Sequence, residues 1–590
     1  MTFKSLNKLF FDRAEQYNEK PFLWAKKNKE WVPLTWNETS LKVKEFAGGL
    51  RSLGIQPGDK VVIISENRPE WIIADLAINL VGAITVPAYT TNTEDDHHYI
   101  LEHSDAKAVI ASSNILANRV ALATTRTNLC KILITLENYS GFEPEDLKII
   151  KFEEVSDFGK NNIGAALDHF EDIQPDDVSC IIYTSGTGGR PKGVMLTHRN
   201  IFSNLQGAED LLEIIGKKDN KYLSLIPLSH SYEHTAGLYL QIDLGSQIYF
   251  CEGPERFSQN LNEVSPTLTT AVPRIFEVIH DRIKIQMKNQ NPIIKFIFNR
   301  AVAVGIKRHH HGLNLLENIE YRSYTNLIRK KINKQLGGKL RAFVSGGAAL
   351  NPEIGDFFIG LGVKILQGYG QTEASPLISA NRPEKIRIET VGPAVKGVEA
   401  KLTEEGELIV KGDCVMKGYW KDEKATNETI IDGWLHTGDV GHIDEKGRIL
   451  ITDRKKDIIV NSGGDNVSPQ RVEGFLTLEP EIAQAMVHGD KRPHLVGLLV
   501  PDADFAADWA AANNTDNILA SLIENDEFIR AIAQAVDRVN ANLGVIERVR
   551  RFALTANAFT VDNEQMTPTL KVRRHVVTDV YKKKLEDLYS

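Results

Sequence analysis

The chain has 590 residues, of which 42% are hydrophobic and 25% are charged, and its formal net charge is −8 at pH 7. A chain of this length is too long for a single hydrophobic core, so we expect at least two domains. The acidic balance argues against a nucleic-acid-binding protein, whose contact surface is usually basic.

The cysteines and the N-terminus predict a reduced, cytoplasmic environment. The four cysteines, at positions 130, 180, 251 and 414, lie far from one another and form no Cys-x-x-Cys pair. This spacing argues against a disulfide framework and against structural zinc. Residues 1–17 carry charges throughout and contain no apolar core, so we expect no signal peptide.

Short apolar runs alternate with amphipathic stretches through the N-terminal part of the chain. This alternation predicts α/β domains with largely parallel sheets. The most apolar stretch, 71–89, contains Asp75, Asn79 and Pro87, and it predicts a buried helix followed by a strand rather than a membrane span. We predict a helix over 41–53 and strands over 60–65, 83–87, 108–111, 131–135, 179–183, 221–226, 247–250, 269–272, 341–344 and 364–367.

The segment 281–341 is strongly basic, although the chain as a whole is acidic. It contains fourteen lysines and arginines against three acids, a net charge of +11, and apolar residues interleave with the charges. Two interpretations stay open: a helical excursion with a solvated basic face, or a surface that contacts an anionic membrane. We predict that the three histidines at 309–311 form a solvated turn rather than a metal site.

The pattern changes near Ala394. Short strands over 399–402, 406–410 and 447–451, separated by turns, predict a small β-rich subdomain over 394–450. The charged run 453–457 that follows predicts either a solvated turn or a hinge. A compact α+β region with an apolar strand over 495–500 occupies the remainder of the chain.

One loop, 184–193, predicts phosphate binding. Glycines let backbone N–H groups point at an anion, hydroxyls donate further hydrogen bonds, and a lysine supplies charge. The spacing fits neither a Walker A loop nor a dinucleotide-binding fingerprint. Its hydroxyl residues are Thr184, Ser185 and Thr187, its glycines are Gly186, Gly188 and Gly189, and Lys192 follows them.

Five further motifs follow this loop in a fixed order. They are Ser345–Leu350, Gln367–Glu373, Gly433–Asp439, Asp453–Asp457 and Pro568–Lys571. Together the six motifs resemble those of the acyl-adenylate-forming, AMP-binding superfamily, and in particular its long-chain fatty acid–CoA ligase branch. The resemblance covers essentially the whole chain. It implies an α/β N-terminal adenylation domain over 1–454 and a mobile α+β C-terminal domain over 455–590.

The resemblance also implies roles for individual residues. The co-substrates would be ATP, handled as its Mg²⁺ complex, and coenzyme A. Thr184, Lys192, Glu373, Arg454 and Lys571 would act in the chemistry, with Lys571 stabilising the first transition state. Thr184 and Glu373 would hold Mg²⁺. Gly347, Ala348, Gln367, Gly368, Tyr369 and Thr372 would surround the nucleotide, with Asp439 and Arg454 on its ribose, Lys456 at the hinge, Gly463 and Gly464 at the coenzyme A channel, and His230 and Tyr232 at the acyl pocket.

The implied reaction joins a fatty acid to coenzyme A through an acyl-adenylate. The run 271–277 and the basic segment after it favour a long acyl chain. Three alternatives stay open: a fatty acyl-AMP ligase that delivers to a carrier protein, a medium-chain or aryl-CoA ligase, and a non-catalytic nucleotide-binding sensor. Gly188, where many relatives have a hydroxyl residue, and Val460, often a lysine, depart from the family pattern.

Overall fold

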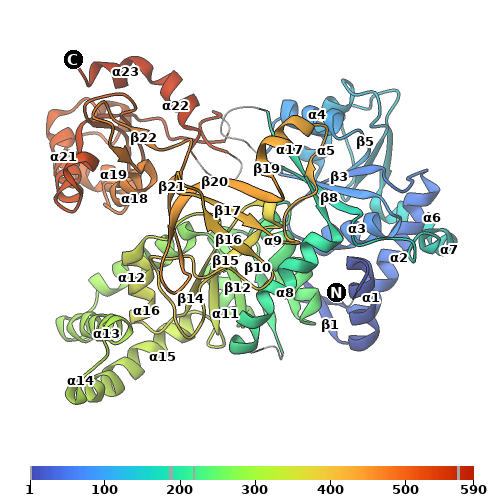
Figure 1. The fold of residues 1–590 in the computed structure, drawn as a ribbon, viewed down its shortest axis with the longest axis horizontal. Helices are drawn as coiled ribbons and strands as arrows, with labels where there is room; N and C mark the ends of the chain where they lie inside the picture. Colours follow the sequence, from blue (N-terminus) through green and yellow to red (C-terminus); the bar gives the residue numbers. More distant parts are fainter. Residues whose placement is uncertain (1–2, 185–189, 217–218, 562, 568–571) are drawn as a thin grey trace.

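The computed structural model describes residues 3–184, 190–216, 219–561, 563–567 and 572–590. In this part of the chain the strands form two eight-stranded sheets, a five-stranded sheet, a three-stranded sheet and one two-stranded pair. Figure 1 shows the C-terminal part, coloured orange to red, set apart at the upper left of a larger body that contains the rest of the chain.

The first large sheet has a parallel interior, as the alternating pattern predicted. Its strands from β8 to β7 run parallel, and β9 is antiparallel to β8. The strands predicted in this region are confirmed, with small shifts at their ends, but β7, β9 and β18 were not predicted. In spatial order the strands are β18 (Gly418–Tyr419), β9 (Lys192–Thr197), β8 (Val178–Thr184), β4 (Ile84–Ala88), β3 (Lys60–Ile64), β5 (Ala106–Ala111), β6 (Ile132–Thr135) and β7 (Lys148–Lys151).

The second large sheet repeats this plan. Its strands from β14 to β1 run parallel, and an antiparallel strand closes each edge. The β1–β2 hairpin was not predicted, because its turn uses Asn28 and Lys29 at positive φ instead of glycine. The strands are β15 (Leu377–Ala380), β14 (Ile365–Gly370), β13 (Ala342–Ser345), β12 (Leu268–Ala271), β10 (Lys221–Ser224), β11 (Gln247–Phe250), β1 (Pro21–Lys27) and β2 (Glu30–Thr35).

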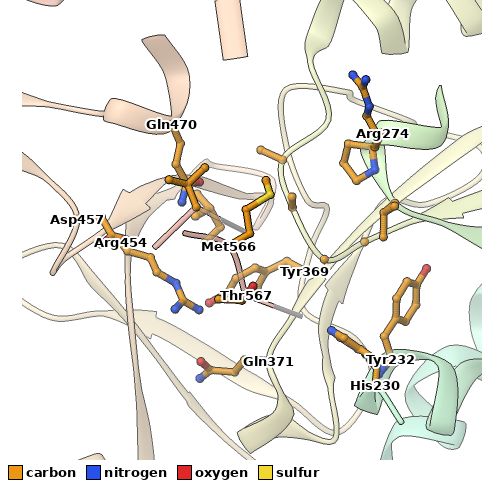
Figure 2. Close-up of a pocket in the computed structure, with 18 of the residues that line it drawn as sticks. His230, Tyr232, Arg274, Tyr369, Gln371, Arg454, Asp457, Gln470, Met566 and Thr567 are labelled. Carbon is orange, nitrogen blue, oxygen red and sulfur yellow. Dashed lines mark hydrogen bonds between the residues drawn. The ribbon is translucent and has the colours of Figure 1, made fainter. Parts of the chain in front are cut away.

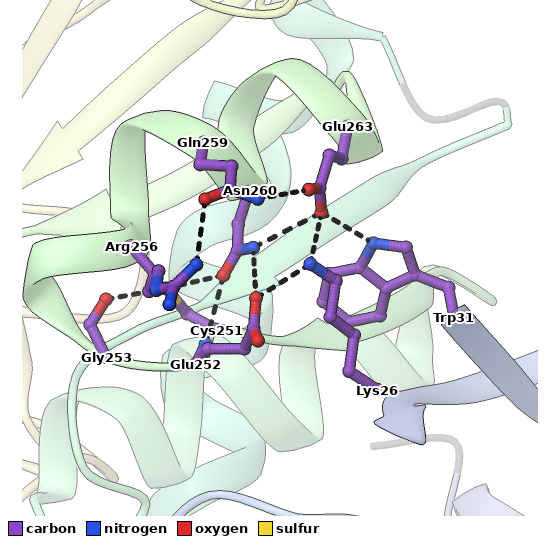
Figure 3. A network of polar contacts seen from close by, with 9 residues as sticks. All are labelled: Lys26, Trp31, Cys251, Glu252, Gly253, Arg256, Gln259, Asn260 and Glu263. Atoms are coloured by element: carbon purple, nitrogen blue, oxygen red, sulfur yellow. Dashed lines mark hydrogen bonds and ion pairs between the residues drawn. The ribbon is translucent and has the colours of Figure 1, made fainter. Parts of the chain in front are cut away.

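An ionic network joins the β1–β2 hairpin, which forms one edge of this sheet, to residues that follow β11 (Figure 3). The Lys26 ammonium lies 2.8 Å from the Glu252 carboxylate and 2.7 Å from that of Glu263, and the Trp31 indole N–H donates to Glu263. Burial alone would lower the pKa of Lys26, but the hydrogen bonds to the two carboxylates outweigh it and raise that pKa. The lysine therefore stays charged although only 10% of its side chain is exposed.

Helices cover the faces of both sheets. In α3 every residue from Trp71 to Leu80 is buried, which confirms the predicted buried helix. The side chain of Thr35 and that of Glu38 form a capping box that starts α2. No helix in the described ranges has the length and apolar character needed to cross a membrane. The main helices are α1 (Leu6–Tyr17), α2 (Trp36–Ser52), α3 (Pro69–Leu80), α4 (Glu94–His103), α5 (Asn114–Thr124), α8 (His198–Ile215), α11 (Phe257–Val264) and α16 (Pro352–Gly360).

The basic segment forms a helical projection at the lower left of Figure 1. It packs closely on α16, which Gly360 ends. The approach leaves no room for a side chain at Gly305, where an added Cβ would lie 2.1 Å from the Gly360 carbonyl oxygen. The prediction of a solvated turn at 309–311 is wrong for the first two histidines: they end α13, are half-buried, and His310 bonds to Asp356 at 2.8 Å. The projection consists of α12 (Pro273–Lys288), α13 (Pro292–His310), α14 (Leu315–Glu320), η3 (Tyr321–Thr325) and α15 (Asn326–Gln335).

The third sheet and the C-terminal part complete the fold. The strands of the third sheet are antiparallel, and they are β16 (Glu399–Leu402), β17 (Glu407–Lys411), β19 (Ile430–Ile431), β20 (Trp434–Ile443) and β21 (Ile449–Arg454). After it, β24 (Ile482–His488), β25 (Leu495–Pro501) and β26 (Val549–Leu554) pack with α18 (Pro469–Leu476), α19 (Ala503–Ala512) and α21 (Asp526–Ala541) around a core of their own. A separate core is the mark of a separate domain.

Candidate active site

The two ends of the predicted phosphate loop face each other across one strand pair. Thr184 is the last residue of β8 and Lys192 the first of β9, and the two are direct partners in the antiparallel ladder. The Tyr99 hydroxyl donates to the Pro191 carbonyl at 2.8 Å and so fixes the second end. Ser185, Gly186, Thr187, Gly188 and Gly189 lie outside the described residues.

The second large sheet contributes the residues expected around a nucleotide. They follow the carboxyl ends of its parallel strands, the position at which ligands bind in α/β sheets. Gly347 follows β13 with φ +85°, a conformation that favours glycine. A Cβ at Gly370, the last residue of β14, would lie 1.8 Å from the Pro376 carbonyl oxygen. The residues that line one cavity here are Gly347, Ala348, Gln367, Gly368, Tyr369, Thr372 and Glu373.

A buried carboxylate joins the second sheet to the third. Asp439 on β20 lies directly opposite Arg454 on β21, and the Arg454 Nε atom is 3.2 Å from Asp439 Oδ1. The Tyr369 hydroxyl donates to the other carboxylate oxygen. Only 6% of the Asp439 side chain is exposed. Burial and the charge of Asp439 raise the pKa of Tyr369 well above its usual range, so the hydroxyl stays a donor.

Glu373 and Lys192 both contact a tyrosine that the sequence reasoning missed. Tyr419 on β18 donates from its hydroxyl to Glu373 Oε1 at 2.9 Å, and the Lys192 ammonium lies 4.8 Å from the centre of its ring. Burial and the charge of Glu373 raise the pKa of Tyr419. Its only sequence signal is the short run Gly418-Tyr419-Trp420, which carries no spacing that indicates a role.

His230 and Tyr232 lie at the opposite side of the cavity from Arg454 (Figure 2). The Tyr232 hydroxyl donates to the Val344 carbonyl at 3.0 Å, and the Tyr232 N–H donates to His230 Nδ1 at 3.1 Å. Arg274, a second residue that sequence reasoning did not single out, lines the same side.

The next residue, Glu233, anchors this segment to the sheet beneath it. It is fully buried and accepts hydrogen bonds from Tyr222 on β10 at 2.9 Å, from Ser224 at 2.7 Å and from Thr270 on β12 at 2.7 Å. Burial raises the pKa of Glu233 to about 7, although the three hydrogen bonds act in the opposite direction. The segment that carries His230 and Tyr232 is therefore held by a carboxyl group whose charge depends on pH.

The C-terminal domain closes the cavity from one side. Met566 and Thr567 line it together with Tyr369 and Arg454, as Figure 2 shows. Lys571 lies outside the described residues. Lys456 also lines the cavity, whereas Gly463 and Gly464 lie in the exposed turn between β22 (Ile459–Val460) and β23 (Asn466–Val467), away from it.

Comparison with known proteins identifies the family. A family model described as AMP-binding enzyme matches residues 10–420, and a model described as AMP-binding enzyme C-terminal domain matches residues 456–590. The chain belongs to the AMP-binding enzyme family. This assignment confirms the resemblance inferred from the six motifs, and it makes the chain an enzyme of that family.

Relatives and solved structures agree with the assignment. The long-chain-fatty-acid–CoA ligase FadD15 of Mycobacterium bovis is 33% identical over 573 residues, covering 95% of this chain and 93% of its own. Human long-chain-fatty-acid–CoA ligase 6 is 31% identical, over 90% of this chain and 78% of its own. The adenylation domain of a carboxylate reductase from Mycobacterium chelonae has the same fold, with a TM-score of 0.75 at 21% identity over 100% of this chain and 92% of that chain. The predicted α/β fold class is confirmed.

The buried Glu233 predicts a pH-dependent stability. Because its pKa in the folded protein, about 7, lies above the unfolded value of 4.5, the folded protein holds a proton between these pH values that the unfolded chain releases. The stabilisation is present below pH 4.5 and is lost as pH rises through 7, an effect of about 3 kcal/mol. We expect the Tm of the wild type, measured relative to that of Glu233→Gln, to fall between pH 5 and pH 8. Glu154→Gln, at an exposed position, is the control, and a pH-independent difference for Glu233→Gln would refute the assignment.

Proposed function

We propose that this enzyme is an ATP-dependent long-chain fatty acid–CoA ligase, which forms an acyl-adenylate and pyrophosphate and then acyl-CoA and AMP. The observation that carries the proposal is that Thr184, Lys192, Glu373, Asp439 and Arg454, far apart in sequence, line one cavity. The names of the relatives support the long-chain acid and the coenzyme A acceptor.

The first half-reaction needs charge stabilisation at the α-phosphate. The fatty acid carboxylate attacks that phosphorus, the bond to the bridging oxygen breaks, and pyrophosphate leaves. Lys571 would stabilise the charge that develops on the α-phosphate, and Lys192 that on the leaving group, the kind of help worth about 3 kcal/mol. Asp439 would accept hydrogen bonds from the ribose hydroxyls, with Arg454 beside it.

The Thr184 hydroxyl and the Glu373 carboxylate fit a magnesium ion, because Mg²⁺ prefers hard oxygen ligands. When bound, the ion would neutralise charge on the phosphates. The protein's part is to present these two oxygens from different elements, Thr184 at the end of β8 and Glu373 in the 3₁₀ turn η4 (Thr372–Ala374).

The second half-reaction uses the same cavity with a different occupant. The coenzyme A thiolate attacks the acyl carbonyl carbon, the bond to the phosphate oxygen breaks, and AMP leaves. We propose that the C-terminal domain (455–590) turns about Lys456, which removes Lys571 and brings Gly463 and Gly464 to the channel. In the present arrangement Met566 and Thr567 line the cavity and the two glycines do not, which fits the first half-reaction.

The acyl chain would lie in the apolar part of the cavity. His230 and Tyr232 stand at this side (Figure 2), and apolar side chains of α8 and α10 (Leu240–Asp243) continue the lining. They are Leu205, Ala208, Leu211, Leu212 and Leu240. An apolar wall of this kind suits a hydrocarbon chain rather than a polar acid.

Product analysis with purified enzyme tests the proposal against its alternatives. With palmitate, ATP and Mg²⁺, we expect pyrophosphate release, and palmitoyl-CoA when coenzyme A is added. If the acyl group appears only on a phosphopantetheinylated carrier protein, the enzyme is an acyl-AMP ligase. If pyrophosphate is released faster with octanoate or benzoate than with palmitate, it is a medium-chain or aryl-CoA ligase. If no acid gives pyrophosphate, the result would support the non-catalytic nucleotide-binding sensor.

We also propose a cytoplasmic location with peripheral contact to an anionic membrane through 281–341. The projection exposes large apolar side chains that a purely solvated helix would not need. Ion pairs from Lys307 to Glu317 at 2.6 Å and from Arg300 to Glu320 engage both acids of α14, so a surplus of basic charge faces outward. The exposed apolar residues are Ile285, Ile293, Phe296, Leu315, Leu316 and Ile319, each more than 60% exposed. Apolar insertion with basic charge around it suits anionic lipid.

Liposome flotation tests this contact. We expect the wild type to float with phosphatidylglycerol vesicles at low salt and less at 0.5 M NaCl, because salt screens charge attraction. Leu315→Ser with Leu316→Ser should lose most of the binding, since it removes the apolar part of the contact. The control, Ile518→Ser, changes an exposed apolar residue of the C-terminal domain. Equal flotation of both variants, or none by the wild type, would overturn the proposal.

A further inference from the structure

Tyr419 is held rigidly beside the phosphate loop. Its strand, β18, pairs with β9, the strand that Lys192 begins, and Tyr419 lies opposite Val194. The following residue, Trp420, donates from its backbone N–H to the Gly193 carbonyl at 2.7 Å and from its indole to the His103 carbonyl at 3.0 Å. The position of the Tyr419 side chain is therefore set by the sheet.

From this position Tyr419 stands between two opposite charges. Its hydroxyl donates to Glu373 Oε1 at 2.9 Å, and its ring faces the Lys192 ammonium at 4.8 Å from the ring centre. No ion pair joins Lys192 directly to Glu373, both of which the structure describes. Glu373 is fixed at its backbone as well, because its carbonyl accepts from the Met416 N–H at 2.9 Å.

We propose that Tyr419 is a positioning residue that keeps Glu373 and Lys192 apart and oriented for the metal–triphosphate group of ATP. A direct pair between them would occupy the oxygens and N–H groups that the metal and the phosphates need. The hydroxyl occupies one carboxylate oxygen and leaves the other for Mg²⁺, whereas the ring attracts the ammonium without accepting all of its N–H groups. This inference rests on the proposed function, which assigns the metal to Glu373 and the phosphates to Lys192.

Two variants separate the two contacts. Tyr419→Phe keeps the ring and removes the hydroxyl, and Tyr419→Leu removes both. The control, Tyr139→Phe, deletes a tyrosine hydroxyl that donates to the Phe142 carbonyl, remote from this cavity. Melting curves establish that each variant folds, and Tyr419→Phe preserves the packing of the ring.

The measurement is ATP affinity by calorimetry, with Mg²⁺ and with EDTA. We expect Mg²⁺ to increase the affinity of the wild type and of Tyr139→Phe for ATP. In Tyr419→Phe this increase should be about tenfold smaller, which corresponds to the loss of a hydrogen bond to a charged group. Tyr419→Leu should also bind ATP more weakly in EDTA, because Lys192 loses its ring contact. In the pyrophosphate assay, Tyr419→Phe should need more Mg²⁺ for half-maximal rate.

Wild-type-like Mg²⁺ dependence in Tyr419→Phe would overturn the positioning role while the proposed function stands. Loss of affinity in EDTA alone, with the gain from Mg²⁺ intact, would likewise overturn the link between Tyr419 and the metal ligand. Failure of the wild type to bind ATP and to release pyrophosphate would instead overturn the proposed function, and the positioning role with it.

Discussion

The buried carboxylate of Asp439 is the constraint on which the arrangement of the cavity depends. A buried charge is unfavourable unless it is paired and hydrogen-bonded. Asp439 forms an ion pair with Arg454 at 3.2 Å and accepts a hydrogen bond from the Tyr369 hydroxyl. These partners come from β21 and β14, so one charge fixes the third sheet against the second. Because Arg454 is the last residue of β21, the same pair fixes the point from which the C-terminal domain departs.

The remaining geometry follows from how the sheets end. Each large sheet has a parallel interior, with antiparallel strands at one edge of the first sheet and at both edges of the second. Strands such as β8 and β13 therefore deliver their carboxyl ends to one cavity. The antiparallel strands at one side of the first sheet add two further residues: β9 returns Lys192 to the level of Thr184, and β18 brings Tyr419 alongside. In the proposed function, the phosphates, the metal and the acyl chain therefore contact residues that several different elements deliver to the same cavity.

Local chemistry could be predicted from the sequence, and long-range pairing could not. The apolar run at 71–89 indicates a buried helix within a few residues, and the glycines and hydroxyls of 184–193 indicate phosphate binding in the same way. The family could be inferred because six such local motifs follow one another in a fixed order along the chain. Tyr419 contacts Glu373, 46 positions away, and no local pattern indicates that contact. The β1–β2 hairpin was missed because Asn28 and Lys29 take the place of glycine, and His310 because Asp356 lies on another helix.

In the proposed function one cavity serves two half-reactions, and Lys571 is needed in the first only. The most direct measurement compares Lys571→Ala with the wild type in both, using Lys583→Ala, an exposed lysine of α23 (Lys582–Asp587), as the control. We expect Lys571→Ala to slow palmitoyl-adenylate formation by more than about a hundredfold, and to make palmitoyl-CoA from supplied palmitoyl-adenylate at nearly the wild-type rate. Equal loss of both half-reactions would refute the role of Lys571 in the first step alone.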